Sequence, residues 1–329
     1  MRGLIWLSLL LASPAWAQEP PPNPAFETAE TFWLARDAYE AGDYDKAADA
    51  ALAAAAAGDT DAAALLGLLY ARGLGVAQDD DAAVAWWREA AEADQADALN
   101  GLADMALNAR GGFSPSDAPG FLERAAQNGD GLAQRRLADI LSIGGFAPRD
   151  PARAGELYAQ AASSGDAEAA YSGAILLIEG ADGLEPQVET GVALLRQAAE
   201  NRLAPAMADY GLMLYQGRGL EPDVNEAAVW FERAAEAGDQ EGQYLYAFAL
   251  LKGEGVEKDL EAGFGWLLRS MGQGPATDPV KEAERQRLAR VLTANLPPDA
   301  VARARAFADD RPAPEPALAI VPSVNADPD

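Results

Sequence analysis

A unit of about 36 residues recurs along most of this chain, and it limits the possible folds more than any other feature. Three copies end an apolar stretch in a Gly-x-Gly loop, at residues 73–75, 217–219 and 253–255. An aromatic residue follows the second glycine of each loop by 11 positions, at Trp86, Trp230 and Trp266. A fixed period of this size predicts a solenoid, because each unit can bury its apolar face only against its neighbours.

The residue types that are present exclude most catalytic chemistry. The chain has 329 residues, a formal net charge of −27, no cysteine and no histidine. Thiolate nucleophiles, imidazole bases and the commonest transition-metal ligands are therefore missing. We expect no enzyme activity, no metal and no cofactor. The negative charge argues against a nucleic-acid partner and would attract a basic protein segment, although surface solvation alone also explains it.

The N-terminus has the pattern of an export signal. Arg2 supplies a positive charge, residues 4–11 form a short apolar stretch, and Ala15-Trp16-Ala17 is a small-x-small cleavage site. We predict a signal peptide over residues 1–17, cleaved after Ala17, and a proline-rich spacer over 18–25. No later stretch is apolar enough for an integral membrane segment. The mature protein is thus predicted to be periplasmic or secreted in a bacterium.

The pattern predicts an all-α protein, with a solenoid of about seven helix-pair repeats over residues 26–280. Residues 281–310 form a polar amphipathic segment suited to a helical C-terminal cap, and residues 311–329 are proline-rich and predicted to be disordered. Two repeats depart from the pattern in their loops, so that their register is open by a residue or two. The predicted repeats are 26–61, 62–97, 98–132, 133–168, 169–205, 206–241 and 242–280, of which 98–132 and 169–205 are the two degenerate ones.

The string small-x4-Leu-Gly-x2-Tyr-x2-Gly-x-Gly-Val, followed by Asp, Trp, Ala-Ala and Gly-Asp, resembles the Sel-one-like repeat of the tetratricopeptide superfamily. The best match is repeat 62–97, with Leu66, Gly67, Tyr70, Gly73 and Trp86 in phase. The resemblance implies a right-handed superhelix whose first helices line a concave face, and a function as an adaptor for protein partners. Some secreted relatives with paired cysteines are linked to β-lactams, but this chain has no cysteine, no Ser-x-x-Lys and no Lys-Thr-Gly.

Candidate binding residues lie where the first helix of each repeat would face the groove. Positions spaced by four residues share one helix face, and in the later repeats these positions become aromatic and aliphatic. Tyrosine and phenylalanine in a concavity are typical anchors for a peptide, although the same rings would also suit packing against the next helix or the cap. The candidates are Arg135, Tyr171, Tyr215, Tyr244, Phe248 and Lys252.

Other conspicuous patterns favour structural roles. The Gly-x-Gly loops lack the preceding strand and third glycine of a dinucleotide site, so we interpret them as left-handed helix C-caps. The acidic cluster at residues 79–81 lacks the spacing of a calcium loop and suits a helix N-terminus. Adjacent bulky residues such as Trp86-Trp87 and Trp230-Phe231 recur in phase, which indicates inter-repeat packing.

The leading hypothesis is an exported, non-enzymatic adaptor that binds a protein or peptide of the cell envelope in its concave groove. We expect the protein to be a monomer. One alternative is a periplasmic regulator that restrains a sensor or an envelope enzyme. The other is an envelope hydrolase, which rests only on distant analogy and on the many carboxylates.

Overall fold

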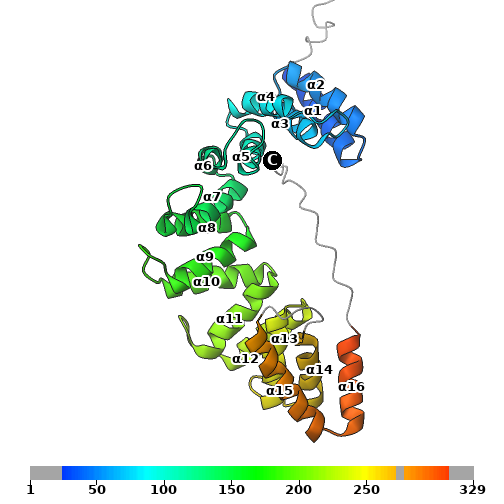
Figure 1. The fold of residues 1–329 in the computed structure, drawn as a ribbon, viewed down its shortest axis with the longest axis vertical. Coiled ribbons are helices and arrows are strands. Elements are labelled where there is room, and N and C mark those ends of the chain that lie inside the picture. Colours follow the sequence, from blue (N-terminus) through cyan, green and yellow to red (C-terminus); the bar gives the residue numbers. More distant parts are fainter. Residues whose placement is uncertain (1–23, 272–277, 311–329) are drawn as a thin grey trace, which may run out of the picture. The chain divides into compact units, whose positions relative to one another are not determined.

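The computed structural model describes residues 24–271 and 278–310 (Figure 1). The predicted signal peptide, almost all of the predicted spacer and the predicted tail lie outside these residues. The described part contains sixteen α-helices, one short 3-10 helix and no β-strand. Its single bridge joins Ala181 and Leu184 in the loop of the fifth repeat.

The helices form seven successive antiparallel pairs followed by two further helices, so the predicted all-α repeat solenoid is confirmed. The 3-10 helix η2 (Pro115–Asp117) stands between the two helices of the third pair. The pairs are α1 (Pro24–Glu40) and α2 (Tyr44–Ala56), α3 (Thr60–Arg72) and α4 (Asp80–Ala91), α5 (Ala96–Leu107) and α6 (Ala118–Gln127), α7 (Gly131–Ile143) and α8 (Pro151–Ser163), α9 (Ala167–Glu179) and α10 (Val188–Glu200), α11 (Ala204–Gln216) and α12 (Val224–Glu236), and α13 (Gln240–Lys252) and α14 (Leu260–Ser270).

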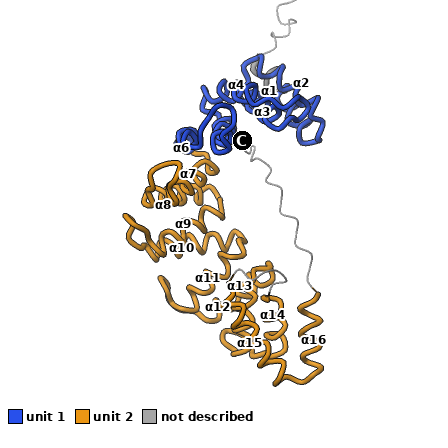
Figure 2. The backbone as a smooth tube through the Cα atoms, in the orientation of Figure 1, with its two compact units in different colours: residues 1–128 blue, residues 129–329 orange. Residues whose placement is uncertain are grey.

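The chain divides into two compact units (Figure 2). Unit 1 comprises residues 1–128 and contains α1 to α6, whereas unit 2 comprises residues 129–329 and contains α7 to α16. Within each unit the second helix of a pair also packs against the first helix of the next pair. Each pair therefore has its own apolar interfaces with its neighbours, as expected of a repeat protein.

Aspartate residues start most of these helices. The side chain of each N-cap aspartate accepts a hydrogen bond from a backbone N–H in the first turn, which would otherwise lack a partner inside the helix. The negative charge at this end also complements the helix dipole. Nine of the 52 acidic residues thus have a capping role. The capping residues are Asp59, Asp79, Asp130, Asp150, Asp166, Asp223, Asp239, Asp259 and Asp278.

The two glycines of a Gly-x-Gly loop have different structural roles. Gly73 and Gly253 end α3 and α13 with φ of 67° and 76°, in the left-handed conformation predicted for a C-cap. The second glycine is needed for space as well. A Cβ at Gly75 would overlap the backbone of Tyr44, and one at Gly255 would overlap the backbone of Val224. Both contacts lie at the start of the second helix of the preceding pair, so the loop fixes the stacking of adjacent repeats.

The recurring bulky residues fill the space between helices. Trp87 is 5% exposed, lies against Gly67 and Gly101, and donates a hydrogen bond from Nε1 to the Ala64 carbonyl oxygen at 3.0 Å. Phe231 lies against Gly211 in the same way. The second member of each bulky pair is the more deeply buried in most repeats, so Trp86 is half-buried while Trp87 is core.

The last two helices pack beside the final pair. α15 (Pro279–Asn295) and α16 (Pro298–Asp309) both contact α14, and they share an apolar cluster with Ala247 of α13. Phe264 and Leu267 of α14 form the fully buried centre of this cluster. None of the helices in the described ranges is both long and apolar enough to cross a membrane.

Candidate functional site

The predicted groove positions lie on what we call the first-helix face, which is formed by α3 and α5 in unit 1 and by α7, α9, α11 and α13 in unit 2. On α5, in unit 1, this face carries Asn100, Asp104 and Asn108 and is polar. The Asn100 and Asn108 side chains donate to the backbone oxygens of Ala96 and Asp104, so both amides are satisfied within α5. The face in unit 1 offers no aromatic side chain at the predicted positions.

In unit 2, Arg135 of α7 reaches the start of α9. Its Nε donates to Asp166 Oδ2 at 2.7 Å, and its Nη1 lies 2.9 Å from Glu168 Oε2. Asp166 is also the N-cap of α9, so its carboxylate accepts hydrogen bonds both from the helix backbone and from Arg135. Arg135 is therefore engaged in joining two repeats, which leaves its half-buried side chain with little freedom to contact a partner.

Tyr171 of α9 bears the same relation to the next repeat. Its hydroxyl donates to Asp209 Oδ2 of α11 at 2.8 Å. Burial raises the pKa of the Tyr171 hydroxyl above its usual range, and the negative charge of Asp209 adds to the effect. Burial likewise raises the pKa of the Asp209 carboxyl, and the nearby Asp239 and Glu241 carboxylates raise it further, against the opposing hydrogen bond from Tyr171.

Tyr244 of α13 occupies the corresponding position two repeats later. It is half-buried, and the Arg285 guanidinium of α15 lies over its ring, with 5.0 Å between the guanidinium carbon and the ring centroid. Tyr244 also packs against the apolar cluster shared by α14, α15 and α16. The last predicted anchor of this series is thus partly covered by α15.

Two other candidates, Tyr215 and Lys252, meet at one carboxylate, and a third, Phe248, lies beside Lys252. The Tyr215 hydroxyl donates to Glu254 Oε2 at 2.6 Å, and Lys252 Nζ lies 3.6 Å from Glu254 Oε1. Lys252 Nζ is also 4.1 Å from the centroid of the Phe248 ring, a cation–π distance. We call Tyr215, Phe248, Lys252 and Glu254 the edge cluster. The Lys252 side chain is half exposed and both rings are half-buried, so the cluster presents aromatic surface with fixed orientation.

Sequence reasoning found the aromatic and basic residues but missed their acidic partners. Neither Asp209 of α11 nor Glu254, the central residue of a Gly-x-Gly loop, was among the predicted candidates. The available signal was the spacing, because Tyr171 to Asp209 and Tyr215 to Glu254 are each about one repeat apart. Contacts between equivalent elements of adjacent repeats recur at that separation.

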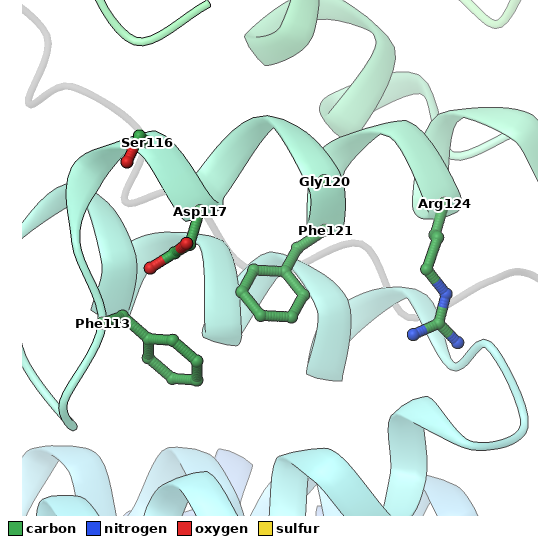
Figure 3. Close-up of a pocket in the computed structure, with 6 residues that line it drawn as sticks. All are labelled: Phe113, Ser116, Asp117, Gly120, Phe121 and Arg124. Carbon is green, nitrogen blue, oxygen red and sulfur yellow. The ribbon is translucent and has the colours of Figure 1, made fainter.

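A shallow open depression of about 470 Å³ lies in unit 1 between η2 and α6 (Figure 3). The Phe113 and Phe121 rings meet edge to face in it, 5.4 Å apart, and Arg124 is bonded to Asp94 and to the Ala91 carbonyl oxygen. Its side chains thus contact one another, and none of the six predicted binding residues lines it. Among the residues with described positions, His, Cys, Asp and Glu side chains nowhere gather in a metal-binding group.

Comparison with known families agrees with this architecture. The Sel1 repeat matches residues 60–95, 131–166, 167–202, 204–239 and 240–274, which together cover more than half of the chain. The chain belongs to the Sel1 repeat family. The matches begin at or close to the start of each first helix, about two residues before the predicted repeat boundaries. They include the fifth repeat, which the sequence pattern marked as degenerate.

Two solved structures resemble this Sel1 repeat protein. The first is c5321, a protective antigen present in uropathogenic Escherichia coli strains that has an SLR fold. It is 24% identical, with a TM-score of 0.51, and the alignment covers 85% of this chain and 68% of c5321. The second is a Sel1 repeat protein from Oxalobacter formigenes, 23% identical with a TM-score of 0.56, covering 80% of this chain and 99% of the other. No curated protein matches the chain.

These likenesses establish the fold. Sel1 repeat proteins are generally scaffolds for protein–protein interaction and are typically non-catalytic. The recurring first helices give such a protein a series of equivalent surface positions, and the residues at those positions decide what each repeat can contact.

Proposed function

We propose that this Sel1 repeat protein is an exported, non-enzymatic scaffold that binds a protein or peptide on the first-helix face of unit 2. The edge cluster is the observation that carries the proposal. It combines two half-buried aromatic rings with a lysine and a carboxylate whose positions are fixed by one another. Aromatic side chains that are held in place lose little entropy on binding and are typical binding hot spots.

The carboxylates of this face support binding rather than chemistry. Asp209 and Glu254 each accept a hydrogen bond from a tyrosine of the preceding repeat. Catalytic acids and bases need a substrate cleft that brings them to a reacting bond. The first-helix face instead offers an extended row of side chains, which suits an elongated peptide.

Charge favours a basic partner. The chain carries a formal net charge of −27, and such a field accelerates the approach of a positively charged segment at low salt. The signal peptide predicted over residues 1–17 places the encounter in the periplasm or outside the cell. A monomeric scaffold, as we expect here, would present one such face per molecule.

The experiment that tests this function is affinity capture from a periplasmic extract, followed by titration of the captured protein. The test variant is Tyr215→Ala/Phe248→Ala. Trp33→Ala/Phe146→Ala is the matched control, because both of its rings are exposed and lie outside the predicted binding residues. We expect the test variant to bind the captured protein at least tenfold more weakly than the wild type, and the control to bind normally.

Two outcomes would contradict the proposal. A partner bound equally by all three proteins would remove the first-helix face from the binding site. If no partner is captured in the periplasm under any salt condition, a scaffold function in that compartment is wrong. Circular dichroism of both variants confirms that the helices remain intact.

A further inference from the structure

The α15 helix is held by ion pairs as well as by a small apolar contact. Of its 17 residues, Arg285 and Ala289 are buried, and most of the others are charged or polar. The neighbouring α16 buries Ala300, Val301, Ala304 and Ala308, and Arg269 of α14 donates to the carbonyl oxygens at its C-terminal end. Apolar burial therefore contributes much more to the docking of α16 than to that of α15.

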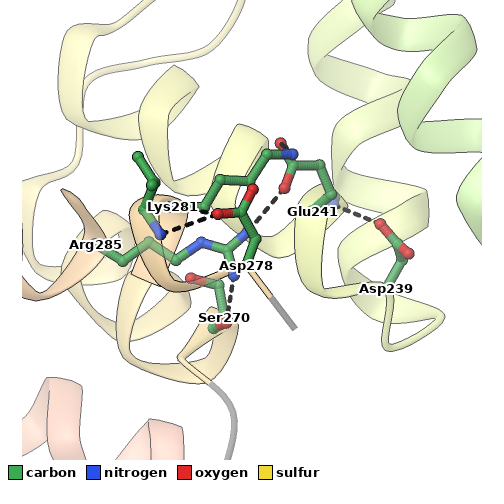
Figure 4. Close-up of polar contacts among 8 residues, drawn as sticks. Asp239, Glu241, Ser270, Asp278, Lys281 and Arg285 are labelled. Atoms are coloured by element: carbon green, nitrogen blue, oxygen red, sulfur yellow. Dashed lines mark hydrogen bonds and ion pairs between the residues drawn. The ribbon is translucent and has the colours of Figure 1, made fainter. Parts of the chain in front are cut away.

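Two cations of α15 bind one carboxylate of α13. Arg285 Nη2 donates to Glu241 Oε2 at 2.8 Å, and Lys281 Nζ lies 3.2 Å from Glu241 Oε1, so both carboxylate oxygens are engaged (Figure 4). Lys281 and Arg285 are one helical turn apart, which places them on the same side of α15. Asp278 starts the helix and accepts from the backbone N–H groups of Val280 and Lys281.

The Arg285 side chain enters a site built from three elements. Its guanidinium lies over the Tyr244 ring of α13, and Nη1 donates to the backbone oxygen of Ser270 at the end of α14, at 3.0 Å. Arg285 is 7% exposed, yet its Nε finds no hydrogen-bond partner among the described residues. The site thus accepts a guanidinium well but satisfies it incompletely, at a cost in free energy.

Acidic groups outnumber the cations around this site. Asp239 and Glu241 of α13 and Asp209 of α11 face Lys281 and Arg285 of α15, whose positive charges lie close enough to act on these carboxyls. Glu284 of α15 adds another negative charge near the Tyr244 hydroxyl. A segment with more positive charge than α15 would complement these carboxylates better than α15 does.

The apolar part of the contact follows the same side of α15. Leu288 and Leu292 pack in the cluster that contains Tyr244, and they lie three and seven residues after Arg285. Together with the two cations they form a basic, amphipathic helical pattern of Lys-x3-Arg-x2-Leu-x3-Leu. Helices of this type bind grooves through one face.

We infer that the surface of α13 and α14 that holds α15, defined by Glu241, Tyr244 and the Ser270 carbonyl oxygen, is a binding site for a basic amphipathic helix of a partner protein. α15 occupies this site in the isolated chain. The inference rests on the proposed scaffold function and names the chemistry of one partner segment. A competing helix with the same pattern displaces α15, and high salt weakens both complexes because the ion pairs are screened.

The test is binding of a fluorescent peptide of residues 278–297 to the full chain, measured by anisotropy. The variant Lys281→Gln/Arg285→Gln releases α15, whereas Arg287→Gln/Arg290→Gln is the matched control, since it removes the same charge from exposed positions of α15. We expect the release variant to bind the peptide at least tenfold more tightly than the wild type or the control. Adding Glu241→Gln to the release variant should abolish this gain.

Equal peptide binding by all three proteins, or no binding by the release variant, overturns the inference. If the release variant does not fold, hydrogen exchange of the wild type replaces the titration. In that measurement, exchange over 279–295 should rise several-fold more than over 298–309 when salt is raised from about 50 to 500 mM. An equal response of the two helices overturns the inference.

Concentration-dependent dimers of the wild type that disappear with Glu241→Gln would identify a second copy as the occupant, and would also overturn the proposal of a different partner. The peptide carries this chain's own sequence, so the result is independent of the capture experiment. A failed peptide titration would contradict this inference but not the proposed binding at Tyr215 and Phe248. A failed capture would contradict the scaffold function but not the ability of the α13 site to bind a basic helix.

Discussion

The same inter-repeat contact is made by an arginine in unit 1 and by a tyrosine at the edge cluster of unit 2. In unit 1, Arg110 reaches back one repeat and donates to the Ala71 carbonyl oxygen, while its Nε donates to Asp80. Four repeats later, Glu254 stands at the position of Arg110 and Tyr215 at that of Ala71, and the direction reverses because the tyrosine donates to the carboxylate. Unit 2 also contains the arginine version, in which Arg218 of the sixth pair donates to the Ile178 carbonyl oxygen of the fifth at 3.5 Å.

One structural position can therefore either only link two repeats or also present an aromatic side chain at the surface. The arginine version ties a loop to a backbone oxygen and leaves alanine or isoleucine on the helix. The tyrosine version needs a ring at the end of α11, and that ring joins Phe248 in the edge cluster. The repeat geometry is the same in both, so the choice of side chains alone places the aromatic rings of the edge cluster at the end of α11 and α13.

The core shows a similar exchange. Trp87 in unit 1 and Phe231 in unit 2 occupy equivalent positions, and each lies against the glycine of its own first helix. Trp87 also lies against Gly101 of the next repeat, whereas the position equivalent to Gly101 in unit 2 is Leu245, in the same apolar cluster as Phe231. A larger residue on one helix is thus matched by a smaller residue on the next.

The largest effect is expected for Gly101→Ala, because its Cβ would overlap the Trp87 indole. Overpacking of this kind should lower the free energy of unfolding by about 1–3 kcal/mol. Gly120→Ala is the matched control, since Gly120 is also helical but has open space around its Cβ position. The control should be neutral or stabilising by up to about 1 kcal/mol. Urea denaturation followed by circular dichroism measures both.

A double variant tests the size match between residues 87 and 101 more directly. Trp87→Phe removes part of the clash, so the double variant Gly101→Ala/Trp87→Phe should be less destabilised than the sum of the two single variants, by about 1 kcal/mol. Strict additivity would mean that Gly101 and Trp87 are not coupled. The size match between adjacent repeats would then be incidental.

A smaller effect with a distinct pH dependence is expected for Asp209→Asn in unit 2. The folded-state pKa of Asp209 is raised above its unfolded value near 3.8, so its favourable contribution is full below that pH and is lost as pH rises through the folded pKa. At pH 7, well above the unfolded pKa, the Asp209 carboxyl group therefore costs stability. The asparagine should raise the free energy of unfolding by about 1 kcal/mol at pH 7, since it still accepts from Tyr171.

The pH profile distinguishes this explanation from a packing effect. In thermal melts at each pH, the advantage of Asp209→Asn over the wild type should shrink as pH falls through the raised folded pKa of Asp209 toward its unfolded pKa. Asp80 in unit 1 has the opposite sign, because the hydrogen bond from Arg110 lowers the pKa of its carboxyl. Asp80→Asn should cost stability at pH 7, and that cost should vanish only below about pH 4.

The smallest effects are expected at the two versions of the inter-repeat contact. Arg110→Gln should cost less than about 1 kcal/mol because the ion pair is partly exposed, and about 0.5 M salt should remove most of the cost. Tyr215→Phe should cost a similar amount, which reflects one hydrogen bond to a carboxylate, but salt should change it much less. Equal salt dependence of the two variants would show that the arginine contact and the tyrosine contact do not differ in their electrostatic character.

Much of the fold was predictable because it depends on local chemistry repeated in phase. The left-handed φ at Gly73 and Gly253 follows from where a helix ends, and the aspartates that open the helices follow from the backbone N–H groups they satisfy. The reason for the second loop glycine was not predictable. Gly75 and Gly255 are small because another repeat's backbone occupies the adjacent space, which no pattern within one unit reveals.

The candidate site was likewise predictable only in part. The positions of Tyr171, Tyr215, Tyr244, Phe248 and Lys252 on the first helices follow from helical spacing. Their partners do not, because Asp209, Glu254 and Arg285 lie about one repeat away in sequence and come close only when the helix pairs stack. Whether these five residues and Arg135 bind a partner stays a prediction.

The sequence by itself determined the helix-pair repeat, since a period of about 36 residues leaves each unit no way to bury its apolar face except against a neighbour. It also determined the helix ends, which depend on residues within one or two turns. Only the tertiary structure decided which aromatic rings are committed to the core and which remain at the surface. That choice depends on the size and charge of side chains from the adjacent repeat, which determine the space and the hydrogen-bond partners available to each ring.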